Sequence, residues 1–192
     1  MKKITLLAIL FITSLSLFAQ ENNYQEDLSK NELKINMSNL IGFKFFDVGY
    51  ERILNEESTI GVNLLFNLDK DSDAASLDEY RTFSITPYYR QFFSNKYAQG
   101  FFIEAFTMLH TAKDYYYYTY DYYDPNTDTY HGDNGSDSDK YTDFAVGISA
   151  GGKWVTKRGF VAEIYLGIGR DLLGNSDDEV VGRGGVAIGY RF

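Results

Sequence analysis

The sequence contains no cysteine, only two histidines and no excess of basic residues. Without cysteine the chain cannot form disulfides or carry a lipid on an N-terminal cysteine, and zinc would lack its usual ligands. There are 18 lysines and arginines against 27 aspartates and glutamates, a net charge of −9, which argues against binding to nucleic acid. Beyond the first 19 residues there is no long apolar run, which excludes a membrane protein built of helices.

The first 19 residues have the three parts of a secretory signal peptide. They comprise a positive start at Lys2 and Lys3, an apolar stretch ending at Phe18, and a small residue, Ala19, at the expected cleavage point. An uncleaved membrane anchor is the alternative, but the apolar stretch is short for a membrane span. Cleavage after Ala19 would change the net charge from −9 to −11, because two lysines are lost.

From residue 32 onward, apolar and polar residues alternate with a period of two, which is the period of a β-strand. The clearest example is 58–68, where large apolar residues alternate with Gly61, Asn63 and Asn67. Eight strands are predicted, at 32–39, 43–53, 58–68, 80–92, 100–111, 141–155, 160–170 and 180–192. The pattern predicts an all-β fold, an eight-stranded antiparallel up-and-down transmembrane β-barrel.

The connections between these strands alternate in length. Three are short, at 54–57, 94–99 and 156–159, whereas 69–79 and 112–140 are long, 172–179 is moderate and only 39–42 is a tight turn on the long side. This alternation is typical of an outer-membrane barrel with both termini in the periplasm. We therefore expect a signal peptide at 1–19, a flexible periplasmic leader at 20–31 and an outer-membrane β-barrel at 32–192.

The two faces of the predicted strands differ in charge and size. One face is apolar and nearly free of charge over the nine to eleven residues that a tilted strand needs to cross a bilayer. The other combines many glycines with charged residues, which suits the narrow interior of an eight-stranded barrel. We expect these charges either to pair and plug the lumen or to line a proton or ion path. The residues are Lys34, Asp47, Glu51, Arg90, Glu104, Lys153, Glu163, Arg183 and Arg191.

The signal peptide, the segment Thr86-Pro87-Tyr88-Tyr89-Arg90, the glycine-rich last strands and the terminal Phe192 carry a resemblance. The chain resembles small outer-membrane barrels of the OmpX and OmpA-barrel type, and more closely the uncharacterised outer-membrane barrels grouped as a domain of unknown function. The resemblance covers residues 32–192. It implies that the barrel-assembly machinery reads a terminal signal formed by Ile188, Tyr190 and Phe192.

Pro87 fits its predicted strand poorly. A closed barrel has no edge at which a missing N–H is harmless, so we expect a local bulge there.

The segment 112–140 has an unusual composition. It contains seven closely spaced tyrosines, followed by Tyr130, together with seven aspartates. Either it is a surface that binds an extracellular ligand, or its first half extends the neighbouring strands as an exposed hairpin with a solvated tip. The residues expected to recognise a ligand are Tyr115, Tyr116, Tyr117, Tyr118, Tyr120, Tyr122 and Tyr123.

The same segment has oxygen ligands spaced by two, as calcium sites do. It lacks the glycine and the closing glutamate of an EF-hand, so no metal site is assigned. The weak candidates are Asp124, Asn126, Asp128, Asp133, Asp137 and Asp139.

The leading functional hypothesis is a non-enzymatic barrel in the outer membrane of a Gram-negative bacterium, with a structural or surface-binding role. A lipid A-modifying enzyme is the first alternative, because His110 is predicted at the outer end of its strand, although no spacing selects a serine and a carboxylate to accompany it. A narrow channel is the second. We expect no catalytic residue, no cofactor, a monomer, and outer-membrane lipid and the assembly machinery as partners.

Overall fold

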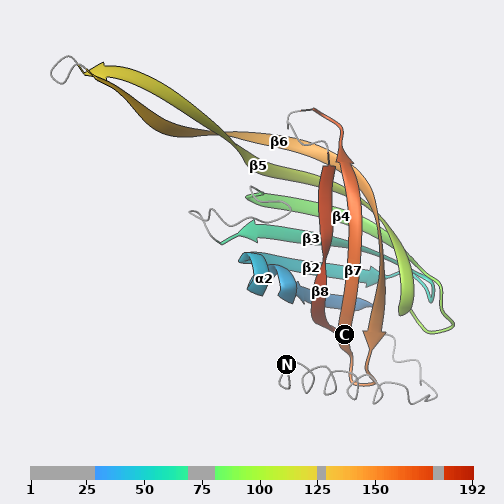
Figure 1. Ribbon diagram of the computed structural model, residues 1–192. Helices are drawn as coiled ribbons and strands as arrows, with labels where there is room; N and C mark the ends of the chain where they lie inside the picture. The colour runs from blue at the N-terminus through green and yellow to red at the C-terminus, as the bar shows by residue number, and fades with distance from the viewer. Residues whose placement is uncertain (1–28, 69–80, 125–128, 175–179) are drawn as a thin grey trace, which may run out of the picture.

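The computed structural model describes residues 29–68, 81–124, 129–174 and 180–192 and forms a closed antiparallel barrel (Figure 1). Each strand pairs with its sequence neighbours, and the first pairs with the last. The predicted eight-stranded up-and-down barrel is therefore confirmed. The strands are β1 (Asn31–Asn36), β2 (Phe45–Ile53), β3 (Ser58–Asn67), β4 (Phe83–Phe92), β5 (Gly100–Asp124), β6 (Thr129–Val155), β7 (Phe160–Asp171) and β8 (Val180–Arg191).

The barrel closes at the end where β1 begins and β8 finishes, which we call the terminal end. There Asn31 N donates to Phe192 O at 3.1 Å and Phe192 N donates to Asn31 O at 2.8 Å. The short connections 54–57, 93–99 and 156–159 lie at this end as well, because the strands run up and down. At the opposite end β5 and β6 continue beyond the barrel as a two-stranded ribbon, so we call it the ribbon end.

The first strand is shorter than its predicted range of 32–39, and the tight turn expected at 39–42 is wrong. A short helix, α2 (Met37–Phe43), follows β1 directly. The Asn36 side chain caps it by accepting from Asn39 N, and Lys44 ends it in a left-handed conformation with φ of 55°. Met37 continues the apolar alternation of β1, so the period alone concealed the end of the strand.

The long connection expected at 112–140 is largely a paired hairpin, so the hairpin interpretation is the correct one for the backbone. β5 and β6 stay in register from Gly100–Lys153 to Asp124–Thr129. Their outer neighbours stop pairing at Thr111 on β5 and at Ala145 on β6. Residues 112–124 and 129–141 therefore form a two-stranded extension, which we call the ribbon and which projects far beyond the barrel (Figure 1).

The bulge predicted at Pro87 is wrong. On the β5 side, ladder pairing passes from Ile85–Leu109 to Tyr88–Phe106, so equal numbers of residues lie between the two pairs. On the β3 side, Pro87 remains paired with Val62. The missing N–H therefore interrupts the ladder locally without adding a residue or changing the register.

The barrel wall separates side chains by size as well as polarity. Inward positions combine charged and aromatic side chains with glycines, because large rings need space across the lumen. A Cβ on Gly151 would lie 2.7 Å from the Phe102 ring, and one on Gly61 would collide with Tyr88. Outward positions carry large apolar side chains that are 38–77% exposed. No helix in the described ranges is long and apolar enough to span a bilayer.

Candidate functional site

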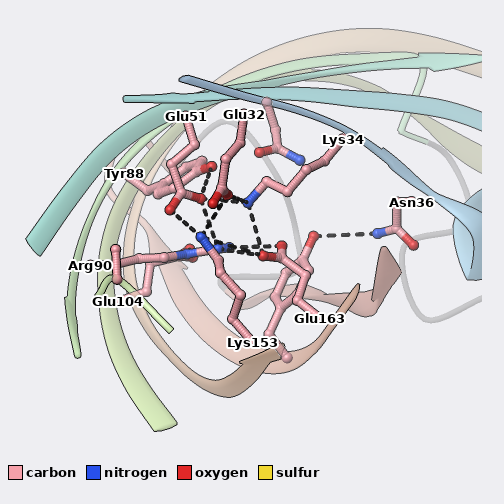
Figure 2. Close-up of polar contacts among 12 residues, drawn as sticks. Glu32, Lys34, Asn36, Glu51, Tyr88, Arg90, Glu104, Lys153 and Glu163 are labelled. Carbon is pink, nitrogen blue, oxygen red and sulfur yellow. Dashed lines mark hydrogen bonds and ion pairs between the residues drawn. The ribbon is translucent and has the colours of Figure 1, made fainter. Parts of the chain in front are cut away.

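The interior of the barrel is filled by buried charged side chains that point toward one another (Figure 2). They come from every strand except β3, because inward positions on neighbouring strands fall at the same level of the barrel. Five are basic and four are acidic. We call them the ion network: Glu32, Lys34, Glu51, Arg90, Glu104, Lys153, Glu163, Arg183 and Arg191.

Glu51 lies at the centre of this network and is fully buried. Its carboxylate accepts from the ammonium groups of Lys34 and Lys153. It also accepts from Arg90 Nη1 at 2.9 Å and from the Tyr88 hydroxyl at 3.0 Å. One carboxylate thus joins side chains from four other positions across the lumen, and charge-assisted bonds of this kind are the stronger ones.

Arg90 connects the centre to the layer nearer the ribbon end. Its Nη1 donates to Glu163 Oε2 at 2.7 Å, and its Nε donates to Glu104 Oε2 at 2.6 Å. The other oxygen of Glu104 accepts from Arg183 Nε at 2.8 Å and from Ser149 at 2.8 Å. The two arginines are therefore held on opposite oxygens of one carboxylate.

Aromatic rings fill the space around the two guanidinium groups. The Tyr88 ring lies 4.6 Å from Arg90 Cζ and 5.2 Å from Arg183 Cζ. Arg90 also lies 4.3 Å from the Phe102 ring, and Arg183 lies 5.2 Å from the Tyr165 ring. Cations at these distances from ring faces are stabilised by the π system, more so away from water.

An apolar plug closes the lumen at the terminal end. It consists of buried side chains from β2, β4, β5 and β7 and from the 93–99 turn, which folds inward. Arg191 fixes this turn by donating to Ala98 O at 2.8 Å, and its Nε bonds Glu32 at 2.7 Å. The plug residues are Ile53, Phe92, Ala98 and Phe102, with Tyr165 at the inner side.

Charges in such an interior are costly unless they are paired, with a penalty of several kcal/mol per ion. Every member of the ion network has an opposite charge within 4.0 Å. The arrangement is therefore a paired network that fills the middle of the lumen, next to the apolar plug.

Eight of the nine charged residues selected from the sequence lie in this network, and Asp47 lies outside it. The Asp47 carboxylate accepts from three amides: Asn36 Nδ2 at 3.0 Å, Asn39 Nδ2 at 2.8 Å and Asn63 Nδ2 at 2.9 Å. Glu32, which the sequence reasoning missed, joins the network instead. It lies at the very start of β1, next to a polar leader, where alternation gives little signal.

A cavity of about 270 Å³ lies between the ion network and the ribbon end. Its apolar lining includes Phe43 of α2 and Met108, and Arg183 lies at its base. Arg183 Nη2 is buried and has no hydrogen-bond partner among the described residues. The cavity therefore combines apolar walls with an unpaired donor atom of Arg183.

His110 is buried in the lumen. Its Nε2 lies 2.9 Å from Asp171 Oδ1, and its Nδ1 is buried without a partner in the described ranges. Strand register places His110 opposite Ser84 on one side and Asp143 on the other. A serine, a histidine and two aspartates thus meet at the ribbon end of the lumen, although no described hydrogen bond joins Ser84 to the imidazole.

The ribbon is described through its backbone. Register places Tyr116 opposite Asp137 and Tyr120 opposite Asp133. Positions two apart in a strand share a face, so tyrosine and aspartate positions gather on one face of the ribbon. All seven tyrosines selected from the sequence occupy paired β5 positions: Tyr116, Tyr118, Tyr120 and Tyr122 at positions of that face, and Tyr115, Tyr117 and Tyr123 at positions of the other.

The weak calcium candidates belong to the segment 112–140. Asn126 and Asp128 lie outside the described residues, while Asp124, Asp133, Asp137 and Asp139 occupy strand positions. Within the described ranges, no group of three or more potential ligands could hold a metal ion.

The three residues of the expected assembly signal share the outer face at the C-terminal end. Ile188, Tyr190 and Phe192 are 47%, 47% and 54% exposed. Tyr190 packs against Phe160 with ring centroids 5.6 Å apart. Phe192 supplies the backbone that closes the barrel on Asn31.

The fold and its interior define a class of protein: closed eight-stranded antiparallel barrels with an ion-paired lumen. Within that class the chain belongs to the family described as protein of unknown function (DUF3575), whose model matches residues 5–179. No curated protein and no solved structure matches the chain.

Proposed function

We propose that this protein is an outer-membrane barrel, closed to ions, that holds its ribbon outside the cell as a recognition surface. The observation that carries the membrane assignment is the inversion of polarity across the wall. Ionised side chains are buried inside, whereas Leu166, Ile148 and Ile168 are at least 60% exposed outside. Water penalises that arrangement and a bilayer favours it, because apolar surface belongs in hydrocarbon.

The outer surface also has the dimensions of a membrane belt. In the described strands of the barrel wall, outward charges occur only at Arg52, toward the terminal end, and at Arg170, toward the ribbon end. Phe83 begins β4 and Phe93 directly follows its end, so the two are ten residues apart, which is roughly 33 Å along a strand. A tilt of about 40° reduces this to about 25 Å, the usual height of the apolar band.

Aromatic side chains mark both edges of this belt. Phe66 and Phe83 pack together toward the ribbon end with centroids 5.2 Å apart. Phe93 and Phe101 pack together toward the terminal end at 6.1 Å. Aromatic girdles at both interfaces are typical of outer-membrane barrels.

The ion network favours a barrel without a conducting path. Its members are fully or almost fully buried and paired, and the apolar plug closes the terminal end. An ion entering the lumen would have to displace pairs whose separation exposes uncompensated charge. A structural or surface role is therefore better supported than a channel.

The ribbon is the best-supported surface for recognition. It extends past every other strand, so barrel closure does not require it. Its tyrosine and aspartate composition suits a carbohydrate or a cationic partner, since tyrosine gives contact area with few rotors and aspartate accepts hydrogen bonds. We infer that its ligand is extracellular and that the barrel anchors the ribbon.

The test first measures the orientation of the barrel in the membrane and then the binding of glycans to the ribbon. Trypsin added to intact cells should cut the ribbon at Lys113 or Lys140 and should spare Lys157 and Arg158 in the turn at the terminal end. The full-length protein should then bind members of a glycan array, and a variant with residues 113–140 replaced by an Asn-Gly turn should lose that binding. Cleavage at Lys157 on intact cells would reverse the orientation, and equal glycan binding by the shortened variant would exclude the ribbon.

Ester hydrolysis is a second candidate function, because His110 bonds Asp171 and lies across from Ser84. These are the side-chain types of a serine hydrolase. Lipid A from cells producing the protein, Ser84→Ala and His110→Ala would be compared by mass spectrometry. An acyl-chain loss that disappears in both variants would establish the enzyme, and identical lipid A in all three strains would exclude it.

A further inference from the structure

The barrel wall has a break on one side of the ribbon end. β1 pairs with β8 only as far as Asn36–Ala187 and with β2 only as far as Ile35–Val48. Residues 180–186 of β8 and 45–47 of β2 therefore have no strand between them on that side. Elsewhere the described wall is a continuous ladder apart from the short interruption at Pro87.

The helix α2 occupies this break and packs against both β8 and β2. It is attached through side chains instead of a ladder. Val186 N donates to Ser38 Oγ at 2.9 Å, and Asn36 Nδ2 donates to Gly184 O at 3.0 Å. On its outer side the helix exposes Ile41 at 76% and Phe43 at 43%. Fewer backbone bonds hold this part of the wall than any strand of similar length would provide.

The 270 Å³ cavity lies directly behind α2, since Ser38, Asn39 and Phe43 line it. Asp47 also lines it, but its oxygens already accept from three amides. Arg183 is different, because Nε bonds Glu104 while Nη2 is buried without a partner in the described ranges. Arg81 adds a second positive charge to the lining.

We propose that this cavity binds the carboxylate end of a fatty-acid-like amphiphile, whose hydrocarbon chain leaves the barrel beneath α2. The carboxylate would accept from Arg183 Nη2, and the first carbons would contact Phe45, Leu65 and Met108. The volume is slightly below the usual range for ligand pockets, about 300–1,000 Å³, so the rest of the chain must lie outside it. This inference rests on the proposed membrane location, which supplies the apolar surroundings for that chain.

A carboxylate fits the site better than a phosphate does. A dianion would place a second negative charge close to Asp47, which already lines the cavity. A monoanion matches the ion network, which has five basic and four acidic members. A neutral head group would leave the Arg183 donor unpaired, which is costly in a buried site.

The first experiment measures head-group selectivity on the full-length barrel folded in a non-ionic detergent. Titration calorimetry with octanoate should show saturable binding of one molecule, at least tenfold tighter than octan-1-ol. Arg183→Gln should weaken octanoate binding at least tenfold, whereas Arg170→Gln, an exposed arginine on β7, should leave it unchanged. Equal affinity for the acid and the alcohol, or equal losses in both variants, would overturn the proposal.

Arg183→Gln also removes the ion pair between Arg183 and Glu104, so a second variant is needed that leaves every ion pair intact. Ser84→Phe fills the cavity wall at a position whose side chain is outside the ion network. It should abolish octanoate binding while the barrel keeps its heat-dependent mobility in SDS gels. Unchanged binding by a correctly folded Ser84→Phe barrel would place the ligand elsewhere.

The exit beneath α2 is tested with 11-(dansylamino)undecanoate, which carries a bulky group at the far end of the chain. If the chain leaves through the break, this probe should bind within threefold of undecanoate. Exclusion of the dansyl probe would refute the exit route. Membrane insertion is measured separately by co-flotation with lipid vesicles, so a barrel that inserts but does not bind octanoate refutes this inference alone.

Discussion

Neutralising Glu51 tests whether the ion network stabilises the barrel. In Glu51→Gln the shape of the side chain is kept, but five basic groups then face three carboxylates. Lys34, Lys153 and Arg90 all lose their shared partner. Breaking a buried ion pair on one side costs about 3–5 kcal/mol of unfolding free energy.

The structure places the expected loss near the lower limit. Lys34 keeps Glu163 at 2.9 Å, Lys153 keeps Glu32 at 2.8 Å, and Arg90 keeps Glu104. We therefore expect a loss of about 3 kcal/mol. With a denaturant slope of about 2 kcal/mol per molar, the urea midpoint should fall by roughly 1.5 M.

The assay is reversible urea unfolding of the vesicle-inserted barrel, followed by the fluorescence of Trp154. This is the single tryptophan, it faces outward, and it leaves the lipid on unfolding. Glu57→Gln is the matched control, because Glu57 is exposed in the turn after the same strand and should change stability by no more than about 0.5 kcal/mol. Adding Lys153→Met to Glu51→Gln should recover part of the loss, since it removes one uncompensated cation. If Glu51→Gln unfolds at the same urea concentration as Glu57→Gln, the network does not stabilise the barrel as reasoned here.

Three further outcomes follow from the membrane assignment. Folded protein should resist SDS at room temperature and migrate differently after boiling, because a closed barrel has no free edge; identical mobility of folded and boiled protein would count against closure in solution. Ile164→Arg, in the middle of the outer belt, should destabilise the inserted barrel by roughly 2–4 kcal/mol. Thr119→Arg on the exposed ribbon should have little effect. Equal urea midpoints for the two variants would show that the outer belt does not face a bilayer. Deleting Phe192 should lower the amount of barrel recovered in outer-membrane fractions while precursor levels stay normal, and unchanged recovery would show that the terminal aromatic is not read during assembly.

Most of the barrel could be predicted because one physical rule applies along every strand. An apolar outer surface and a narrow polar lumen require opposite side chains at successive positions, and residues such as Ile60, Gly61, Val62 and Asn63 follow this pattern directly. The rule fails where its cause is absent. The ribbon encloses no lumen, so its two faces do not differ as apolar and polar, and the sequence could not distinguish a loop from a paired extension.

The candidate site was predictable in kind but not in partners. Inward charges could be identified from alternation, yet their pairing depends on distances across the lumen that no strand encodes alone. Glu51 and Lys153 are 102 residues apart, and His110 and Asp171 are 61 apart. Asp47 was expected to pair with a basic residue, but three amides donate to it instead, and two of these belong to Asn36 and Asn39 at the start of α2. The strand period concealed this helix.

The closure between Asn31 and Phe192 determines when this protein can fold at all. The side-chain bond joining these residues spans 161 of the 192 positions in the chain. Closing a loop of that length costs about 4–5 kcal/mol of chain entropy before any contact compensates for it. β1 can pair with β2 early, but its other edge must stay open until the last strand has been synthesised. Premature termination anywhere in the chain leaves two open sheet edges, which attract other strands. A truncated chain is therefore a substrate for proteases or for aggregation, and only the full chain can form the closed barrel.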